Sequence, residues 1–134
     1  MRMRGKLPIF SYRDTFSLDA TLAPIICAGL KKFKDTISST DWGGYPNGFK
    51  TEEDWHEVLD KMIWSFENVD FEIGLPPEYW EEFDGLDPLE VITRERTPTQ
   101  KVLWGEYMDN CEAHQEKLQE GFDLFAKHFR SLWW

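Results

Sequence analysis

The stretch from Thr51 to Asp70, TEEDWHEVLDKMIWSFENVD, constrains the fold of this chain more than any other. Its apolar residues recur three and four positions apart, which places them along one side of an α-helix. They are Trp55, Val58, Leu59, Met62, Ile63, Phe66 and Val69. Thr51 is the expected N-cap, and Asp54 gives a shortened capping box. The sequence therefore predicts an amphipathic helix over residues 51–70 that needs partners elsewhere in the chain.

Two further helices are expected to provide those partners. Apolar spacing predicts a first helix over residues 17–34, capped by Ser17 and containing Pro24, and a last helix over residues 99–131, capped by Thr97. A chain of this length suits one domain. We therefore expect an all-α fold, a helical bundle of three main helices in a single domain over residues 1–134. The last helix carries a heptad-like seam, so we also expect a homo-oligomer, a dimer through this helix.

The segments between these helices have distinct compositions. Residues 1–15 form a basic arm, which is either a short edge strand or a solvated tail. Residues 36–50 form a loop rich in Gly and Pro. Residues 71–97 form an acidic insert with several aromatic residues, in which we expect short helices over 77–83 and 88–92. The chain closes with Trp133 and Trp134, which we expect to be exposed unless something covers them.

The charge of the chain is strongly negative and unevenly placed. The net charge is −10, and residues 51–90 hold fourteen Asp and Glu but a single Lys. Binding to duplex nucleic acid through phosphates needs a basic surface, so we expect no direct duplex binding. No apolar run approaches the length of a membrane span, and no signal peptide is visible. We therefore expect no membrane association and a cytoplasmic location.

Catalytic and metal-binding patterns are weak in this sequence. The pair Glu53-x-x-His56 has the spacing found in di-metal helical bundles, but the last helix offers Cys111-x-x-His114 in place of the second motif that such sites need. There is no nucleophile elbow and no glycine-rich phosphate loop leading into a helix. Acidic pairs are too numerous for any one of them to be specific. We expect no enzyme activity, no metal and no cofactor.

Two binding hypotheses remain open. In the first, aromatic residues of the 36–50 loop stack on a small nucleotide-type ligand while arginines hold its phosphates. In the second, the acidic region mimics nucleic acid and docks on a basic host protein. The candidate ligand-binding residues are Trp42, Tyr45, Arg13, Arg94 and Arg96. The candidate partner-binding residues are Glu78, Tyr79, Trp80, Glu81, Glu82 and Asp84. The competing interpretation is that the rings pack the loop and the core, and that the acids form an ordinary solvated face.

Residues 14–67 also carry a family resemblance. The motif Asp14-x-Phe-Ser-Leu-Asp, a helix ending Leu30-x-x-Phe-Lys, a Gly/Pro loop and the run beginning Glu52-Glu-x-Trp resemble small uncharacterised proteins encoded by tailed bacteriophages. The resemblance implies a phage accessory protein that acts in the cytoplasm of an infected cell, and it implies no catalytic residues. It favours a non-enzymatic, counter-defence protein that sequesters a small nucleotide-type ligand. The alternatives are an acidic inhibitor of a basic host protein and a minor structural component of the virion.

Overall fold

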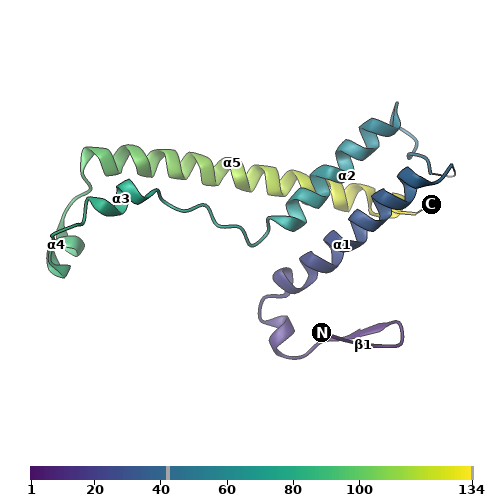
Figure 1. Ribbon diagram of the computed structural model, residues 1–134, viewed down its shortest axis with the longest axis horizontal. Helices are drawn as coiled ribbons and strands as arrows, with labels where there is room; N and C mark the ends of the chain where they lie inside the picture. Colours follow the sequence, from purple (N-terminus) through teal and green to yellow (C-terminus); the bar gives the residue numbers. More distant parts are fainter. Residues whose placement is uncertain (42, 134) are drawn as a thin grey trace. The chain divides into compact units, whose positions relative to one another are not determined.

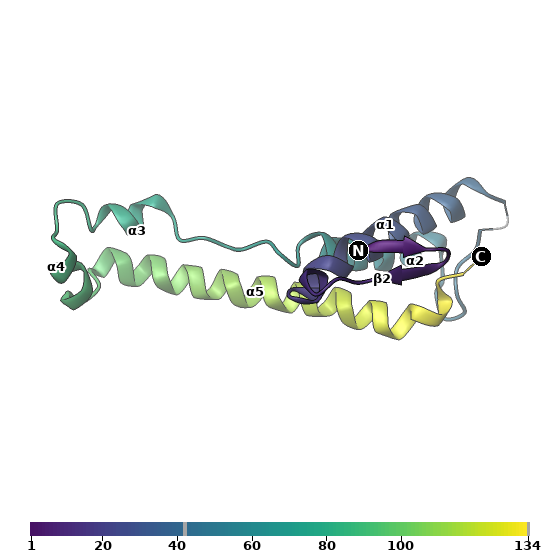
Figure 2. The same cartoon turned by 90° about the horizontal axis from the view of Figure 1, so that it is seen from below.

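The computed structural model describes residues 1–41 and 43–133, and these are mostly helical, as the sequence predicts. Figures 1 and 2 show its helices and its small hairpin from two sides. The α-helices of the described residues are α1 (Leu18–Ser39), α2 (Glu52–Glu67), α3 (Pro77–Glu81), α4 (Pro88–Thr93) and α5 (Pro98–His128). The strands are β1 (Arg2–Arg4) and β2 (Leu7–Ile9), and the 3-10 turns are η1 (Arg13–Thr15) and η2 (Phe129–Ser131). None of the described helices combines the length and the apolar character that a bilayer crossing requires.

The helix ends depart from the predicted bounds for local reasons. Helix α1 runs through Pro24 and continues to Ser39, beyond the predicted end at residue 34. Helix α2 stops at Glu67 because Asn68 closes it, with its side-chain Nδ2 donating to the carbonyl of Trp64 at 2.8 Å. Its start is as expected, since the hydroxyl of Thr51 accepts from the backbone N–H of Asp54 at 3.2 Å. Ser17 occupies the N-cap position of α1 but makes no side-chain capping bond.

The chain divides into two compact units. The core unit contains Met1–Asp70 and the chain from Lys117 onward, and the insert unit contains Phe71–Glu116. Helix α5 contributes its first part to the insert unit and its last part to the core unit. The sequence-based expectation of a single domain over residues 1–134 stays a prediction.

The core unit is built on α1 and α2, whose apolar stripes face each other. The buried residues are Cys27, Leu30 and Ile37 from α1 and Trp55, Leu59, Met62 and Ile63 from α2. The last turns of α5 cover this cluster with Leu124 and Phe125, and Leu132 follows them. The stripe predicted over residues 51–70 is therefore the centre of the core, apart from Val69, which lies beyond the end of α2.

Helix α5 crosses α2 at very close range. A Cβ atom added to Gly121 would lie 2.5 Å from the carbonyl oxygen of Lys61 and 2.6 Å from the Cβ of Ser65. Ser65 is fully buried, and its hydroxyl donates to the carbonyl of Lys117 at 3.4 Å. Beside this crossing, the Phe66 ring meets that of Phe122 edge-on at 5.2 Å. Only glycine lets the two backbones approach to this distance.

The basic arm folds into a hairpin followed by a 3-10 turn. Strands β1 and β2 pair antiparallel, with Arg2 opposite Ile9 and Arg4 opposite Leu7. Gly5, with φ of 62°, makes the turn between them. The sequence left an edge strand and a solvated tail as alternatives, and the structure shows a strand pair whose residues are all exposed.

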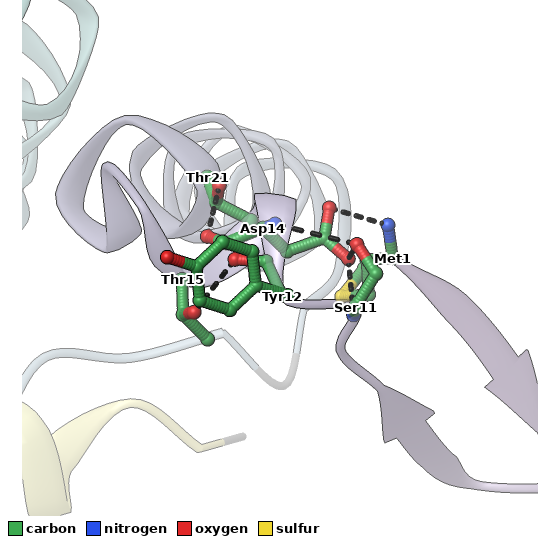
Figure 3. Close-up of polar contacts among 6 residues, drawn as sticks. All are labelled: Met1, Ser11, Tyr12, Asp14, Thr15 and Thr21. Carbon is green, nitrogen blue, oxygen red and sulfur yellow. Dashed lines mark hydrogen bonds and ion pairs between the residues drawn. The ribbon is translucent and has the colours of Figure 1, made fainter.

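Asp14 ties this hairpin to the rest of the core unit (Figure 3). Its carboxylate accepts from the Met1 ammonium at 2.8 Å and from the Ser11 backbone N–H at 2.7 Å. Its backbone carbonyl accepts from the hydroxyl of Thr21, in the first turn of α1, at 2.8 Å. The Met1 ammonium and the hydrogen bonds from Ser11 to the carboxylate lower the pKa of Asp14 to about 2.

The insert unit is organised around a buried glutamine. Gln100 accepts at its Oε1 from the Thr97 backbone N–H at 3.1 Å and donates from Nε2 to the Tyr79 carbonyl at 3.1 Å. The hydroxyl of Thr97 accepts from the Gln100 backbone N–H at 3.2 Å, which confirms Thr97 as the cap of α5. The two short helices fall where the sequence predicts them, although α3 ends at Glu81 rather than residue 83.

Candidate ligand pocket

The loop between α1 and α2 takes a shape that two glycines determine. A Cβ on Gly43 would lie 2.7 Å from the backbone carbonyl carbon of Ile37, so no other residue fits against the end of α1. Gly48 has φ of 105°, a conformation that favours glycine. Between them the chain turns at Pro46, whose carbonyl accepts from the Phe49 backbone N–H at 3.3 Å. The loop therefore presents residues 44–47 at a defined place beside α2.

A pocket of about 430 Å³ lies between this loop and the chain end. Its lining consists of Gly44, Tyr45, Pro46, Asn47, Trp55, Ser131 and Trp133. Trp55 is 1% exposed, whereas Tyr45 is 46% and Trp133 is 75% exposed. The pocket thus joins one buried ring from the core to two solvent-accessible rings, and it lies wholly within the core unit. We call it the aromatic pocket.

The buried ring of this pocket is held by its neighbours. Trp55 packs against the ring of Phe49 at 5.1 Å, and it meets His128 edge-on at 5.6 Å. Burial and the nearby charge of Lys127 lower the pKa of His128, so its imidazole is neutral at pH 7. The Tyr45 hydroxyl donates to the Lys50 carbonyl at 3.4 Å, which orients its ring within the loop.

The polar groups of the aromatic pocket are uncharged. Among the described residues, no Lys, Arg, Asp or Glu side chain lines it, and its side-chain hydrogen-bonding groups are the Asn47 amide, the Ser131 hydroxyl, the Tyr45 hydroxyl and the indole N–H groups. Aromatic faces with a few neutral donors and acceptors suit a planar group that carries little charge.

The structure distributes the predicted ligand residues among different places. Tyr45 lines the aromatic pocket, whereas Trp42 lies outside the described residues. Arg13 is exposed in η1. Arg94 and Arg96 belong to the insert unit.

Both insert arginines are engaged within their own unit. Arg94 donates from Nη2 to the carbonyl of Glu82 at 2.9 Å. Arg96 donates from Nε to the Tyr79 hydroxyl at 3.1 Å, and its guanidinium lies 4.1 Å from the centre of the Trp104 ring. These contacts give the arginines a structural role in the insert unit.

The predicted partner residues all lie on or next to α3. Glu78, Trp80, Glu81 and Asp84 are exposed, and Glu82 is half-buried. Tyr79 is buried, because it packs against Trp80 and Trp104 while Arg96 holds its hydroxyl. The acidic side chains therefore form a surface, and Tyr79 supports that surface from beneath.

Of the seven described lining residues of the aromatic pocket, Tyr45 alone was predicted as a ligand-binding residue, and the other six were missed. Trp55 was assigned to the core, which is correct, but its edge also lines the pocket. Trp133 was expected to be exposed, and it is, but no role was assigned to it, while Trp134 lies outside the described residues. Gly44, Pro46 and Asn47 carried only the signal of turn formers, and Ser131 carried none. The proximity of a loop near residue 45 to a chain end near residue 133 depends on tertiary packing.

The residues singled out as weak metal or catalytic patterns do not converge. Among the described residues, no three His, Cys, Asp or Glu side chains gather where they could hold a metal ion. His56 lies with its Nε2 3.4 Å from the Oε1 of Glu52, and His114 packs against the Phe71 ring at 5.6 Å. Cys27 is a free, buried thiol whose pKa is raised by burial, which makes it a poor nucleophile.

No protein-family model, curated protein or solved structure matches this chain, so what the pocket can bind has to be derived from its own residues.

Proposed function

We propose that this protein is a non-enzymatic binding protein that captures a small planar ligand of nucleotide type in the aromatic pocket. The observation that carries the proposal is the grouping of Tyr45, Trp55 and Trp133 around one cavity of about 430 Å³. Two of these rings are accessible to a ligand, and the third is fixed by core packing. Pockets of about 300–1,000 Å³ are typical for small-molecule ligands.

The chemistry of the lining favours recognition of the base rather than the phosphates. Stacking of a base on an aromatic side chain contributes about 1–3 kcal/mol, and it needs no charge. The protein carries a net charge of −10, and the described lining offers no cation. Phosphate groups therefore gain little here, and we expect a nucleobase or nucleoside to bind at least as well as its triphosphate.

The biological setting of the proposal comes from the resemblance of residues 14–67 to tailed-phage proteins. It favours an accessory protein that sequesters a host signal in the cytoplasm of an infected cell.

We also propose that the helices form one bundle domain. Assembly through the seam of α5 also stays a prediction, and much of that seam is occupied by the chain itself, because Leu118 is buried and Phe125 packs on the core.

A second candidate function is inhibition of a basic host protein by the acidic surface on α3. The observation in its favour is that Glu78, Glu81 and Asp84, which flank the exposed Trp80 in the sequence, are exposed and have no ion-pair partner among the described residues. Reversing the charges of Glu78, Glu81, Glu82 and Asp84 should abolish this activity and leave ligand binding in the aromatic pocket unchanged.

Titration calorimetry with nucleosides and their phosphates tests the first function. Replacement of Tyr45 or Trp133 by Ala should weaken binding of the best ligand about tenfold or more, since a lost stacking contact of about 1.4 kcal/mol is a factor of ten. Trp80→Ala is the matched control, because it removes an exposed indole in the insert unit. Equal loss in the control and the pocket variants, or no loss in either, would contradict the proposal.

A further inference from the structure

The N-terminal hairpin and the turn after it expose an unusual amount of apolar surface. Leu7 is 72% exposed, Tyr12 82% and Phe16 81%. The other large apolar side chains of this segment, which are also exposed, are Met3, Ile9, Phe10 and Leu18. We call the exposed side chains of residues 2–18 the hairpin surface. Exposed apolar surface bordered by polar residues is typical of interaction sites on soluble proteins.

The composition of the strand pair favours packing against a further surface. The register places Leu7 opposite Arg4 and Ile9 opposite Arg2, so each apolar residue of one face has a cation as its cross-strand neighbour. Figure 1 shows the hairpin, in purple, standing apart from α1 and α2, and every residue of both strands is exposed. An isolated two-stranded hairpin is marginally stable in water, and packing on a further surface stabilises it.

The hairpin surface is nevertheless anchored at its base. The hydrogen bonds that Asp14 accepts from Ser11, from the Met1 ammonium and from Thr21 connect both ends of the hairpin to η1 and α1 (Figure 3). This arrangement presents a preformed surface, which lowers the ordering cost of binding.

The cations of the hairpin surface are unpaired. Arg2, Arg4, Lys6 and Arg13 are all exposed, and no ion pair joins any of them to another described residue. Some lysines of the helices, by contrast, are paired with carboxylates. Lys34 pairs with Asp60 at 2.6 Å, and Lys61 pairs with Glu120 at 2.8 Å. The hairpin therefore combines exposed apolar side chains with free positive charge.

The insert unit displays the complementary combination. Residues 62–93 contain no Lys or Arg, and in α3 and the turn after it Glu78, Glu81 and Asp84 are exposed. Large apolar side chains are exposed in the same part of the chain, namely Trp80, Leu89 and Ile92. We call the exposed side chains of residues 78–92 the acidic face. Its carboxylates also lack ion-pair partners among the residues that the structure describes.

We propose that the hairpin surface of one copy binds the acidic face of a second copy. Apolar side chains on both surfaces supply buried area, and the opposite charges select the partner and the orientation. If each copy offers its hairpin surface to the other, the two contacts are identical and close a two-fold dimer. The acidic face then serves assembly of the chain itself, and the aromatic pocket uses none of these residues.

Charge reversal on each surface tests this pairing with the full-length chain. One variant carries Arg2→Glu, Arg4→Glu and Lys6→Glu, and the other carries Glu78→Lys, Glu81→Lys and Asp84→Lys. Light scattering coupled to size exclusion should show a dimer for the unmodified chain and a monomer for each variant alone. An equimolar mixture of the two variants should form a heterodimer, because both reversed contacts are then attractive.

The controls separate this pairing from other kinds of assembly. The variant Lys32→Glu, Lys50→Glu, Lys101→Glu makes the same change of charge at exposed lysines outside both surfaces, and it should remain a dimer. Salt should weaken the unmodified dimer about tenfold or more, since exposed charges are screened. A monomeric unmodified chain, dimers in both charge-reversed variants, or failure of the mixture to assemble would each overturn the proposal. Circular dichroism confirms that each variant is folded, and ligand titration of the same variants reports on the aromatic pocket independently.

Discussion

Replacement of Gly121 by Ala tests the close crossing of α2 and α5. In the interior of an exposed helix, Ala is more favourable than Gly by about 1 kcal/mol, so the helix alone predicts stabilisation. At Gly121 the new methyl group would lie 2.5 Å from the Lys61 carbonyl oxygen. That oxygen belongs to the backbone of α2, so it has no rotamer by which to move away.

The size of the effect follows from the distance. Ordinary contact at a Cβ begins at 3.4 Å, so the helices would have to separate locally by about 0.9 Å. A gap of about 0.5–1 Å forfeits a quarter to a half of the dispersion energy of the atoms that face it. Overpacking of a core typically costs about 1–3 kcal/mol. After subtraction of the propensity gain of about 1 kcal/mol, we expect Gly121→Ala to destabilise the protein by about 1 kcal/mol.

The matched control is Gly105→Ala in the same helix. Gly105 is exposed, and a Cβ added there meets nothing within 4 Å. We expect this variant to gain about 0.8 kcal/mol from helix propensity alone. Thermal and urea unfolding followed by circular dichroism should move in opposite directions for the two variants. Stabilisation of both by the same amount would refute the packing of α5 against α2.

Three further predictions concern a cap, a buried amide and a buried imidazole. Thr51→Ala should lower the unfolding free energy by about 1 kcal/mol in urea titrations, whereas Ser17→Ala, at a cap position with no side-chain bond, should leave it nearly unchanged. Gln100→Ala leaves the buried hydrogen-bonding partners of this side chain unsatisfied, so it should lower the unfolding free energy by about 2–4 kcal/mol and speed hydrogen exchange in residues 71–116. The control Gln115→Ala, at an exposed position, should change the unfolding free energy by less than about 0.5 kcal/mol. The fold lowers the pKa of His128 below the ordinary histidine value of about 6.5, so below that pH the unfolded chain binds more protons than the folded one. The melting temperature should therefore fall as the pH drops below about 6.5, and His128→Gln should remove that dependence.

Local sequence patterns predicted the presence of the helices, although not all of their ends. The three- and four-residue spacing in α2 predicts both the helix and the residues of its buried side, and the hydroxyl of Thr51 caps it as expected. The extension of α1 to Ser39 was less visible, because Thr36 and Ser38 are poor predictors of a helix interior. In the fold their hydroxyls donate to the carbonyls of Lys32 and Lys34 one turn earlier.

Contacts between distant residues account for what the sequence did not reveal. Arg96 looked available for a phosphate, but Tyr79, 17 residues earlier, accepts its hydrogen bond. The aromatic pocket depends on a loop near Tyr45 meeting a chain end near Trp133. The spacing of apolar residues indicates the structure of a single helix or strand, so it could not predict either of these two contacts between distant residues.

Native mass spectrometry with a panel of nucleobases, nucleosides and nucleotides tests the central claim, ligand capture by the aromatic pocket, most directly. We predict one added ligand per chain for at least one nucleobase or nucleoside. This adduct should be lost when Tyr45 and Trp133 are both replaced by Ala, and it should be retained in Trp80→Ala. An unmodified chain that binds no member of the panel, or an adduct that survives in the double variant, would contradict the claim.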